Sequence, residues 1–406
     1  MSSENFNYMI TIIGGTYREV NLEQGSHEIF GSGLRSANYI LENTDSAVQY
    51  YTFGDCKVQK HLNNYKKIFK AFNFQIEEID HLITFKYNFA LDNPDIYPDP
   101  NTLNIGKPTE VVGDNIICFG SLEGSFNSTG NKVVYDPQTS INPKLFSTTN
   151  KAQEVIYVVN KSEAESISKS KEINEILNFF FDVEKVKALI IKNGPSGAKV
   201  YLSNSEGLPI PAYITDKVHK IGSGDIFTTA FSYYWFNTDW EIPECALYAS
   251  KSTALYCNYG AGAVLNKNSI FEFKEFNPQN ISNKQVYLAG PIFSLSEIIL
   301  VDKVREALLG FGIKVFSPYH DVGYGNSKQI AIKDIQGIEN SDIILCLLDG
   351  LDSGTLIELG YAMSKGKKLI GYHTTVEHDS LFMLKVADIE YYNDLTTALY
   401  KVIWSL

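Results

Sequence analysis

Two short stretches of this 406-residue chain combine glycines with carboxylates at a spacing that could do chemistry. The first holds Gly222, Ser223 and Gly224, is followed at once by Asp225, and leads into an apolar, aromatic helix pattern. Because glycines let successive amide N–H groups converge at a helix N-terminus, such a turn can bind a phosphate. Asp225 could then take the proton of a hydroxyl that attacks this phosphate. Taken alone, Gly-x-Gly-Asp also fits an ordinary loop and helix cap.

The second stretch runs from Asp352 to Glu358 and could break a glycosidic bond. Asp352 or Ser353 can cap a helix that begins at Gly354, which puts Glu358 near the first turn and a half of that helix. In an open parallel sheet, ligands bind in the crevice outside the carboxyl ends of the strands. A carboxylate there can attack the anomeric carbon of a nucleoside as the base leaves, while a second carboxylate carries the proton of the base. The alternative is that Glu358 is a solvated helix charge.

Short apolar strands alternate with helices around the first stretch. Such an alternation predicts an α/β fold with a mostly parallel sheet and helices on both faces. Residues 93–108, which hold several prolines and asparagines, predict a long loop or a small lid. The strands are expected at residues 9–13, 116–119, 132–135, 155–159 and 188–192, and the helices at 31–40, 57–72, 162–168, 172–181 and 226–236.

A second, smaller α/β domain is expected after a polar segment rich in asparagine. We place the first domain at residues 1–275, the linker at 276–284 and the second domain at 285–406. The strands of this second domain are expected at residues 285–288, 314–316, 343–348 and 368–371, and its helices at 294–309, 328–338, 354–364 and 395–404.

Composition and charge exclude several classes of protein. An apolar fraction of 44% and a charged fraction of 20% are typical of a globular protein with a full core. The net charge of −12, without a long basic run, argues against binding to nucleic acid or to an anionic membrane. The five cysteines lack the spacing of a zinc site or a disulfide framework, and the N-terminus has no signal peptide pattern. We therefore expect a cytoplasmic protein without a membrane span.

Several further motifs precede the glycine turn in a fixed order. They are Gly33 with Ala37-Asn38, Asp136-Pro137-Gln138, Asn160 with Glu163, and the turn Asn193-Gly194 with Gly197. Together with the glycine turn, these motifs resemble the PfkB (ribokinase-like) family of sugar and nucleoside kinases, over about residues 8–275. The resemblance implies a ribokinase-like fold for the first domain.

This resemblance also implies an ATP-dependent kinase that uses Mg²⁺, with Asp225 as its catalytic base. The acceptor substrate would contact Gly33, Asn38 and Glu19, and Glu163 would contact Mg²⁺ indirectly. The chain departs from the family where Glu19 replaces an Asp, and where His219-Lys220 replaces the Asp-Thr that usually precedes the signature. The residues implied to hold ATP are Gly222, Ser223, Gly224, Asn160, Glu163, Asn193, Gly194 and Gly197.

Residues 285–406 resemble the nucleoside 2-deoxyribosyltransferase family, which has a flavodoxin-like, doubly wound fold. The motifs that carry this resemblance are Tyr287-Leu288-Ala289-Gly290-Pro291 with Phe293, then Asp334, then Asp352-Ser353-Gly354-Thr355 with Glu358. The resemblance implies Glu358 as nucleophile and Asp334 as the group that handles the proton of the base. It implies no cofactor for this domain. Substrate contacts are implied for Tyr287, Gly290, Pro291, Phe293, Asp352, Ser353, Gly354 and Thr355.

The resemblance matches Asp352 to the carboxylate with which the transferases bind the free 5′-hydroxyl of the sugar. A carboxylate in this place would repel a 5′-phosphate. The sequence thus favours a free nucleoside over a nucleoside monophosphate.

The two resemblances together predict a bifunctional enzyme of nucleoside metabolism, a kinase joined to an N-glycosidase or deoxyribosyltransferase. One alternative is a single-activity glycosidase with a degenerate, kinase-like regulatory or binding domain. Another is a hydrolase of a nicotinamide-type N-ribosyl compound. The expected partner is a small nucleoside or sugar, and both families lead us to expect a homo-oligomer.

Overall fold

The computed structural model divides into two compact units. The first comprises Met1–Asn88 and Pro94–Phe276, and the second comprises Phe89–Asn93 and Asn277–Leu406. The structure describes residues 9–103, 107–278, 281–323, 328–376, 381–382, 384, 386 and 388–406.

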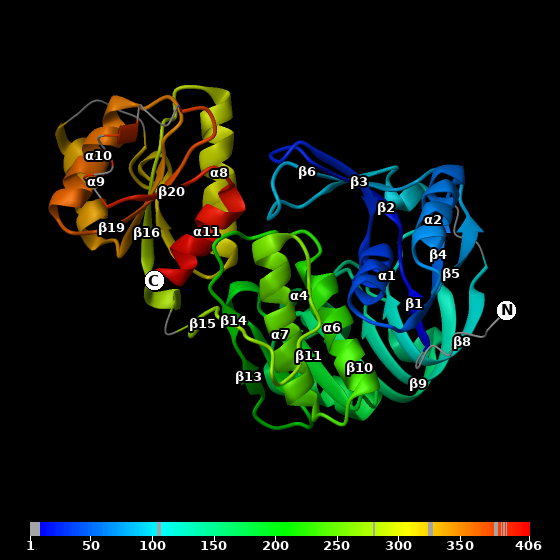
Figure 1. Cartoon of the computed structure of the whole chain (residues 1–406). Helices are drawn as coiled ribbons and strands as arrows, with labels where there is room; N and C mark the ends of the chain where they lie inside the picture. The colour runs from blue at the N-terminus through cyan, green and yellow to red at the C-terminus, as the bar shows by residue number, and fades with distance from the viewer. Residues whose placement is uncertain are drawn as a thin grey trace. The chain divides into compact units, whose positions relative to one another are not determined.

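A nine-stranded sheet forms the centre of the first unit (Figure 1). The seven strands from β11 to β5 are parallel, and β12 and β13 are added antiparallel at one edge. The central strands of the parallel part are buried on both faces over much of their length, which is why residues 9–13, 155–159 and 188–192 read as apolar runs. In sheet order the strands are β13 (Leu208–Ile210), β12 (Ala198–Tyr201), β11 (Ala188–Lys192), β10 (Lys151–Asn160), β9 (Phe126–Asp136), β8 (Thr109–Phe119), β1 (Met9–Ile13), β4 (Ala47–Gly54) and β5 (Phe72–Glu78).

Helices cover both faces of this sheet. Strand residues of one parity, such as Ile12 and Ile117, pack against α1 (Ser32–Asn43), α2 (Cys56–Ile68), α6 (Ser223–Asn237) and α7 (Ile242–Tyr259). Residues of the other parity, such as Ile116, pack against the opposite helices, because side chains alternate along a strand. Those helices are α3 (Phe146–Thr149), α4 (Lys161–Ser168), α5 (Ile173–Asn178) and the π-turn Phe179–Val183.

A second sheet of four strands, β3-β2-β6-β7, was not predicted from the sequence. Its strands are short and only partly buried, so they lack the apolar runs that mark the main sheet. Part of it lies in the segment 93–108 that was expected to be a long loop or lid. The strands are β2 (Tyr17–Asn21), β3 (Ser26–Phe30), β6 (Thr84–Tyr87) and β7 (Asp95–Tyr97); a small pair, β14 (Ala212–Tyr213) and β15 (Glu275–Phe276), completes the unit.

The second unit is built on a five-stranded parallel sheet in the order β17-β16-β18-β19-β20. Figure 1 shows α9 and α10 on one side of this sheet and α8 and α11 on the other. The strands are β16 (Gln285–Ala289), β17 (Lys314–Phe316), β18 (Ile343–Leu347), β19 (Lys368–Tyr372) and β20 (Glu390–Tyr392), and the helices are α8 (Leu295–Gly310), α9 (Lys328–Asn340), α10 (Ser353–Ser364) and α11 (Leu395–Trp404).

The expected fold class is confirmed: a large, mostly parallel sheet with helices on both faces is followed by a smaller doubly wound domain. Boundaries differ most at β8 and β9, which begin seven and six residues earlier than expected. Their first halves pair with each other and, in β9, also with the half-exposed start of β10, so they carry no apolar run. Within the described ranges, no helix combines the length and the hydropathy that a membrane crossing requires.

Candidate active sites

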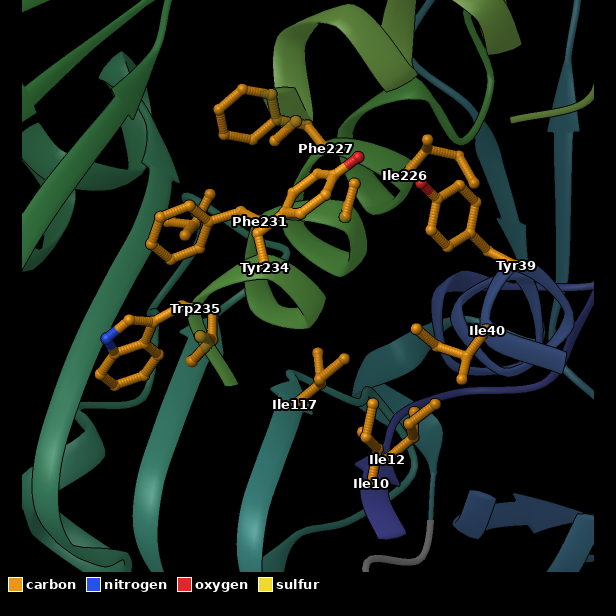
Figure 2. Packing of buried hydrophobic residues seen from close by; sticks show 14 of the residues in the cluster. Ile10, Ile12, Tyr39, Ile40, Ile117, Ile226, Phe227, Phe231, Tyr234 and Trp235 are labelled. Atoms are coloured by element: carbon orange, nitrogen blue, oxygen red, sulfur yellow. The ribbon is translucent and has the colours of Figure 1, made fainter. Parts of the chain in front are cut away.

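The glycine turn of the first unit is positioned by the buried helix α6. Ile226, Phe227 and Phe231 anchor this helix in the core beside Ile40 of α1, as Figure 2 shows. Gly222 precedes the helix with φ of +81°, a left-handed conformation that glycine adopts without strain. Asp225 then falls in the first turn of α6 and is itself buried. The core therefore presents the turn and its carboxylate at a fixed place.

Both carboxylate oxygens of Asp225 accept hydrogen bonds from side chains. Arg35 Nη1 donates to Oδ2 at 2.7 Å, and Gln138 Nε2 donates to Oδ1 at 3.2 Å. Burial raises the pKa of Asp225 above its ordinary value, and the charge of Arg35 opposes this rise. Asp225 is thus a buried carboxylate whose negative charge is balanced by one arginine.

Arg35, on α1, also binds Glu19 of β2 through its Nη2 atom. One buried guanidinium therefore joins the predicted catalytic base to the predicted acceptor-binding carboxylate. Arg35 was not predicted from the sequence as a site residue. It lies two residues after Gly33 in the segment assigned to substrate binding, but nothing in its sequence spacing indicates that it faces Glu19 and Asp225.

A second ion pair lies at the carboxyl ends of β9 and β11. Lys192 Nζ donates to Asp136 Oδ2 at 2.7 Å, and Thr228 of α6 donates to the same oxygen at 2.8 Å. A Cβ added to Gly224 would lie 3.6 Å from Lys192 Nζ, so this ammonium flanks the glycine turn. Burial lowers the pKa of Lys192, but the charges of Asp136 and Glu163 outweigh it and raise this pKa.

Glu163 and Asn160 form a capping box at the start of α4. Asn160 accepts from the Glu163 amide at 2.9 Å, and Glu163 accepts from the Asn160 amide at 2.8 Å. Burial and then the charge of Asp136 raise the pKa of Glu163 to about 7, while Lys192 acts in the opposite direction. The structure thus brings Glu163 into the same electrostatic cluster as Asp225.

Lys220, one of the residues at which the chain departs from the PfkB pattern, donates to Ser223 at 3.3 Å. Burial lowers its pKa, and the nearby positive charge of Lys192 lowers it further. Lys192 and Lys220 could both meet a phosphate at the glycine turn. His219 is half-buried and contacts the chain through its amide, which donates to Cys257 O.

Glu163 is the residue of this cluster that would reach Mg²⁺, through water. The described residues contain no group of three or more His, Cys, Asp or Glu side chains that could hold a metal ion. Asp136 is bonded to Lys192 and Thr228, whereas Glu163 keeps a carboxylate near the glycine turn that could contact a hydrated cation. Mg²⁺ usually keeps several waters and binds through one or two carboxylates together with substrate phosphates.

The other predicted residues of this site are distributed around it. Position 33 requires a glycine for packing, because a Cβ there would lie 2.7 Å from the Tyr50 ring. Gly197 has φ of +84°, and a Cβ would lie 2.1 Å from Ile210 O. Asn38 is half-buried on α1, and Asn193 and Gly194 are exposed after β11.

In the second unit, Tyr287 of β16 donates a hydrogen bond to Glu358 Oε1 of α10 at 2.7 Å. Burial raises the pKa of Glu358 to about 7; the Tyr287 hydrogen bond lowers this pKa, and the charges of Asp334 and Asp352 raise it. Tyr287 itself is fully buried and stacks on Phe316, which fixes its hydroxyl in place. Glu358 is thus a carboxyl that changes charge near neutral pH.

Asp334 of α9 carries a buried oxygen, Oδ1, without a hydrogen-bond partner in the part of the chain that the structure describes. Burial raises its pKa as well. Because its charge acts on both Glu358 and Tyr287, Asp334 belongs to the same cluster. A carboxyl that is poised to hold a proton beside a second carboxyl is the arrangement that glycosidic bond cleavage needs.

Asp352 is the N-cap of α10, and the helix begins at Ser353, one residue before the expected start. Its Oδ2 accepts from Thr355 N at 2.8 Å and from Thr355 Oγ1 at 3.2 Å. Ser353 and Gly354 are exposed in the first turn, and Thr355 is buried. Gly290 packs on Leu347 and Pro291 is buried, whereas Phe293 is 80% exposed before α8.

Comparisons with known proteins give one family match in each of two parts of the chain. Residues 126–267 match the family model described as pfkB family carbohydrate kinase, and residues 286–393 match that of nucleoside 2-deoxyribosyltransferase. Both families consist of enzymes. The chain is also similar to an uncharacterized protein of Ureaplasma parvum serovar 3, with 28% identity over 97 residues; these cover 20% of this chain and 61% of the length of that relative.

Solved structures with a similar course of the chain are kinases of the ribokinase family. A pyrophosphate-dependent kinase complexed with a pyrophosphate analog and myo-inositol has 13% identity and a TM-score of 0.43, and covers 63% of this chain and 98% of its own. A Vibrio cholerae fructokinase with bound fructose, ADP and calcium has 12% identity and a TM-score of 0.46, with 63% and 94% covered. A Methanocaldococcus jannaschii nucleoside kinase has 16% identity and a TM-score of 0.40, with 63% and 95% covered.

Proposed function

Because one part of this chain matches a carbohydrate kinase family and the other matches a nucleoside 2-deoxyribosyltransferase family, we propose that it is a bifunctional enzyme of nucleoside metabolism. The geometry supports the second activity best, namely the cleavage or transfer of an N-glycosidic bond. The observation that carries it is the raised pKa of Glu358, about 7. This carboxyl accepts a hydrogen bond from Tyr287 and is affected by the charge of Asp334, whose own pKa is raised.

In the proposed reaction, ionised Glu358 attacks the anomeric carbon of a nucleoside. The bond from this carbon to the base nitrogen breaks, its electron pair stays on the base, and protonated Asp334 supplies the proton. A covalent glycosyl ester on Glu358 remains. Water or a second base then attacks the same carbon, Asp334 takes up the released proton, and Glu358 leaves as a carboxylate.

Asp352 supports a free nucleoside as the substrate. Both hydrogen bonds from Thr355 end on its Oδ2, so Oδ1 is the oxygen that we assign to the 5′-hydroxyl of the sugar. A 5′-phosphate in that place would face the Asp352 carboxylate and would be repelled. The same chemistry would serve a hydrolase of a nicotinamide-type N-ribosyl compound, which is the alternative for this unit.

A trapped intermediate tests this assignment. A nucleoside with an electron-withdrawing 2′-fluorine should slow the breakdown of the covalent ester more than it prevents its formation. Intact-mass spectrometry should show the added sugar, and peptide mapping should place it on Glu358. Glu358→Gln should release base at least about 10³-fold more slowly, because the nucleophile is lost. Parental base release by Glu358→Gln, or a sugar on another residue, would remove Glu358 as the nucleophile.

Phosphoryl transfer by the first unit is the second candidate. The observation that favours it is the glycine turn with Asp225 at its end and the ammonium of Lys192 at its side. The site has the groups to hold ATP phosphates on the turn and on Lys192 and Lys220, with Mg²⁺ reached through Glu163 and water. Bound Mg²⁺ would neutralise charge on the phosphates. Asp225 would take the proton of the attacking hydroxyl of a sugar or nucleoside.

A phosphorylation assay over a panel of sugars and nucleosides tests the kinase. Asp225→Asn should lower transfer by roughly 10²–10⁴-fold while ATP binding persists. If the parent protein transfers phosphate to no acceptor, the alternative holds: a single-activity glycosidase with a kinase-like binding or regulatory domain.

A reducing, cytoplasmic setting belongs to the proposal, since all five cysteines are free thiols in the structure.

A further inference from the structure

Arg35 has no part in the reactions proposed above, yet it contacts the two carboxylates on which the kinase reaction depends. Its guanidinium is bound by Asp225 through Nη1 at 2.7 Å and by Glu19 through Nη2. Its side chain is only 6% exposed, so both ion pairs are shielded from water. The place between the acceptor-binding carboxylate and the base is therefore filled by this one side chain.

Filling this place has a direct consequence for Asp225. Oδ2 accepts from Arg35, and Oδ1 accepts from Gln138 Nε2 at 3.2 Å. A general base must lie within hydrogen-bond reach of the hydroxyl that it deprotonates. While Arg35 Nη1 occupies Oδ2, an acceptor hydroxyl cannot take the same position. The charge of Arg35 also favours the ionised, proton-free form of Asp225, which opposes uptake of a proton.

Contacts beyond the two carboxylates hold Arg35 where it is. Phe30 lies beneath the guanidinium, with its ring centroid 4.9 Å from Cζ. On the other side, a Cβ at Gly222 would lie 2.1 Å from Arg35 Nε, so the side chain crosses directly over the glycine turn. Breaking a buried ion pair by removing one partner leaves an uncompensated charge and is strongly unfavourable.

We infer that Arg35 closes the acceptor subsite of the first unit: an acceptor can reach Asp225 only by displacing the guanidinium. The inference rests on the kinase part of the proposed function. A guanidinium offers two N–H donors at a fixed spacing. The acceptor that replaces it must likewise offer two donors, one to Glu19 and one to Asp225, which a pair of neighbouring hydroxyls on a sugar or polyol supplies. Arg35 is thereby a residue that selects the acceptor and keeps the empty site inactive.

Chemical rescue can test whether the place between the carboxylates is a subsite. Arg35→Ala should leave a guanidinium-sized hole lined by Glu19 and Asp225 and should melt at a lower temperature. Roughly 10 mM guanidinium, far below the molar concentrations at which it denatures proteins, should raise the melting temperature of Arg35→Ala by several degrees. The parent, the control Arg18→Ala on the opposite face of β2, and the double variant Arg35→Ala/Asp225→Asn should show no such rise.

Acceptor binding tests the displacement itself. D-ribose, D-fructose and myo-inositol are titrated by calorimetry into the full chain, and nucleosides are left out because the second unit is proposed to bind them. A polyol should bind Arg35→Ala at least about tenfold more tightly than the parent, because no ion pair has to open first, and it should compete with guanidinium. Arg35→Lys, which keeps the charge but can bind only one carboxylate well, should fall in between and covers the case that Arg35→Ala does not fold.

The outcomes separate this inference from the kinase assignment. Equal affinity of a polyol for parent and variants, or a folded Arg35→Ala without guanidinium rescue, would overturn the closure by Arg35. Polyols that bind neither protein would overturn the acceptor subsite. Tighter binding without any Asp225-dependent phosphate transfer would reject the kinase and leave the inference standing.

Discussion

At the scale of single residues, both units hold carboxyls whose charge is controlled by what surrounds them. In the first unit Asp225 is buried but balanced by Arg35, so its charge is locked in an ion pair. In the second unit Glu358 accepts a hydrogen bond from the neutral Tyr287 hydroxyl and faces two further carboxyls. We therefore expect the first site to depend on displacing a cation and the second site to depend on pH.

The rate of base release should follow the ionisation of Glu358. Its pKa of about 7 means that the nucleophile is protonated below this pH, so with a nucleoside whose base leaves without the proton of Asp334 the rate should rise as pH increases through about 7. Tyr287→Phe removes the hydrogen bond that lowers this pKa, and the rising limb should therefore move to higher pH. The measurement is the pH profile of single-turnover base release. A limb that stays in place, or moves to lower pH, would contradict the role of Tyr287.

Glu358 should also make the second unit less stable at high pH. An unfolded Glu has a pKa near 4.3, so the folded state holds its proton more tightly between about pH 4 and 7. Stability is therefore lost as pH rises through this window, and Glu358→Gln should melt several degrees above the parent at pH 8 and close to it at pH 4. Thermal melts at both pH values check this. Glu306→Gln, at an exposed position of α8, is the control and should change little. A Glu358→Gln protein less stable than the parent at pH 8 would show that the carboxylate is well compensated.

At the scale of elements, the core determines where the glycine turn lies. The aromatic side chains of α6 pack on the sheet and on α1, and this packing fixes the first turn of the helix. The two glycines of the turn then differ in what they leave room for. Gly222 has a positive φ and lies against Arg35, whereas a Cβ on Gly224 meets only Lys192 Nζ, at van der Waals distance.

Alanine at each glycine should separate folding from phosphate binding. Gly222→Ala should destabilise the first unit by about 1–2 kcal/mol for the left-handed backbone alone, and by more because the Cβ clashes with Arg35. Gly224→Ala should keep the fold and weaken ATP binding, because a methyl group then stands beside Lys192, and Gly224→Val should damage both binding and rate. Melting temperatures and ATP titrations give the comparison. Unchanged ATP affinity in Gly224→Ala would argue against phosphate binding at this turn.

At the scale of the whole molecule, the chain contains two complete sheets, each with helices on both faces. The second unit gathers residues 277–406 around its own parallel sheet and includes Phe89–Asn93, whose Asp92 pairs with Lys303 at 2.9 Å. The core of this unit is formed by residues of its own strands and helices, among them Ile344, Leu359 and Leu369.

A fragment that begins near Asn283 should therefore fold alone. Limited proteolysis should cut the full chain within residues 276–284, and the fragment should melt cooperatively. It should be slightly less stable than the same unit in the full chain, because Lys303 loses Asp92. An insoluble fragment, or one without a cooperative transition, would mean that the second unit needs more of the chain than its own sheet.

The sequence by itself indicated the fold class, the central strands of both main sheets and most of the helices, because these depend on local signals. Apolar runs mark buried parallel strands, and the spacing of glycines and carboxylates in 222–225 and 352–358 marks helix starts. The predicted bounds of β11 (Ala188–Lys192) and of α11 (Leu395–Trp404) agree with the observed bounds to the residue.

Only the tertiary structure decided which charges meet. Arg35 stands 16 residues from Glu19 and 190 from Asp225, and no periodicity links positions so far apart. Likewise Tyr287 and Glu358 are 71 residues apart, and the raised pKa of Glu358 results from burial, which a sequence does not display. The partly polar sheet of β2, β3, β6 and β7 was missed for the same reason: its strands are stabilised by pairing with each other rather than by an apolar pattern of their own.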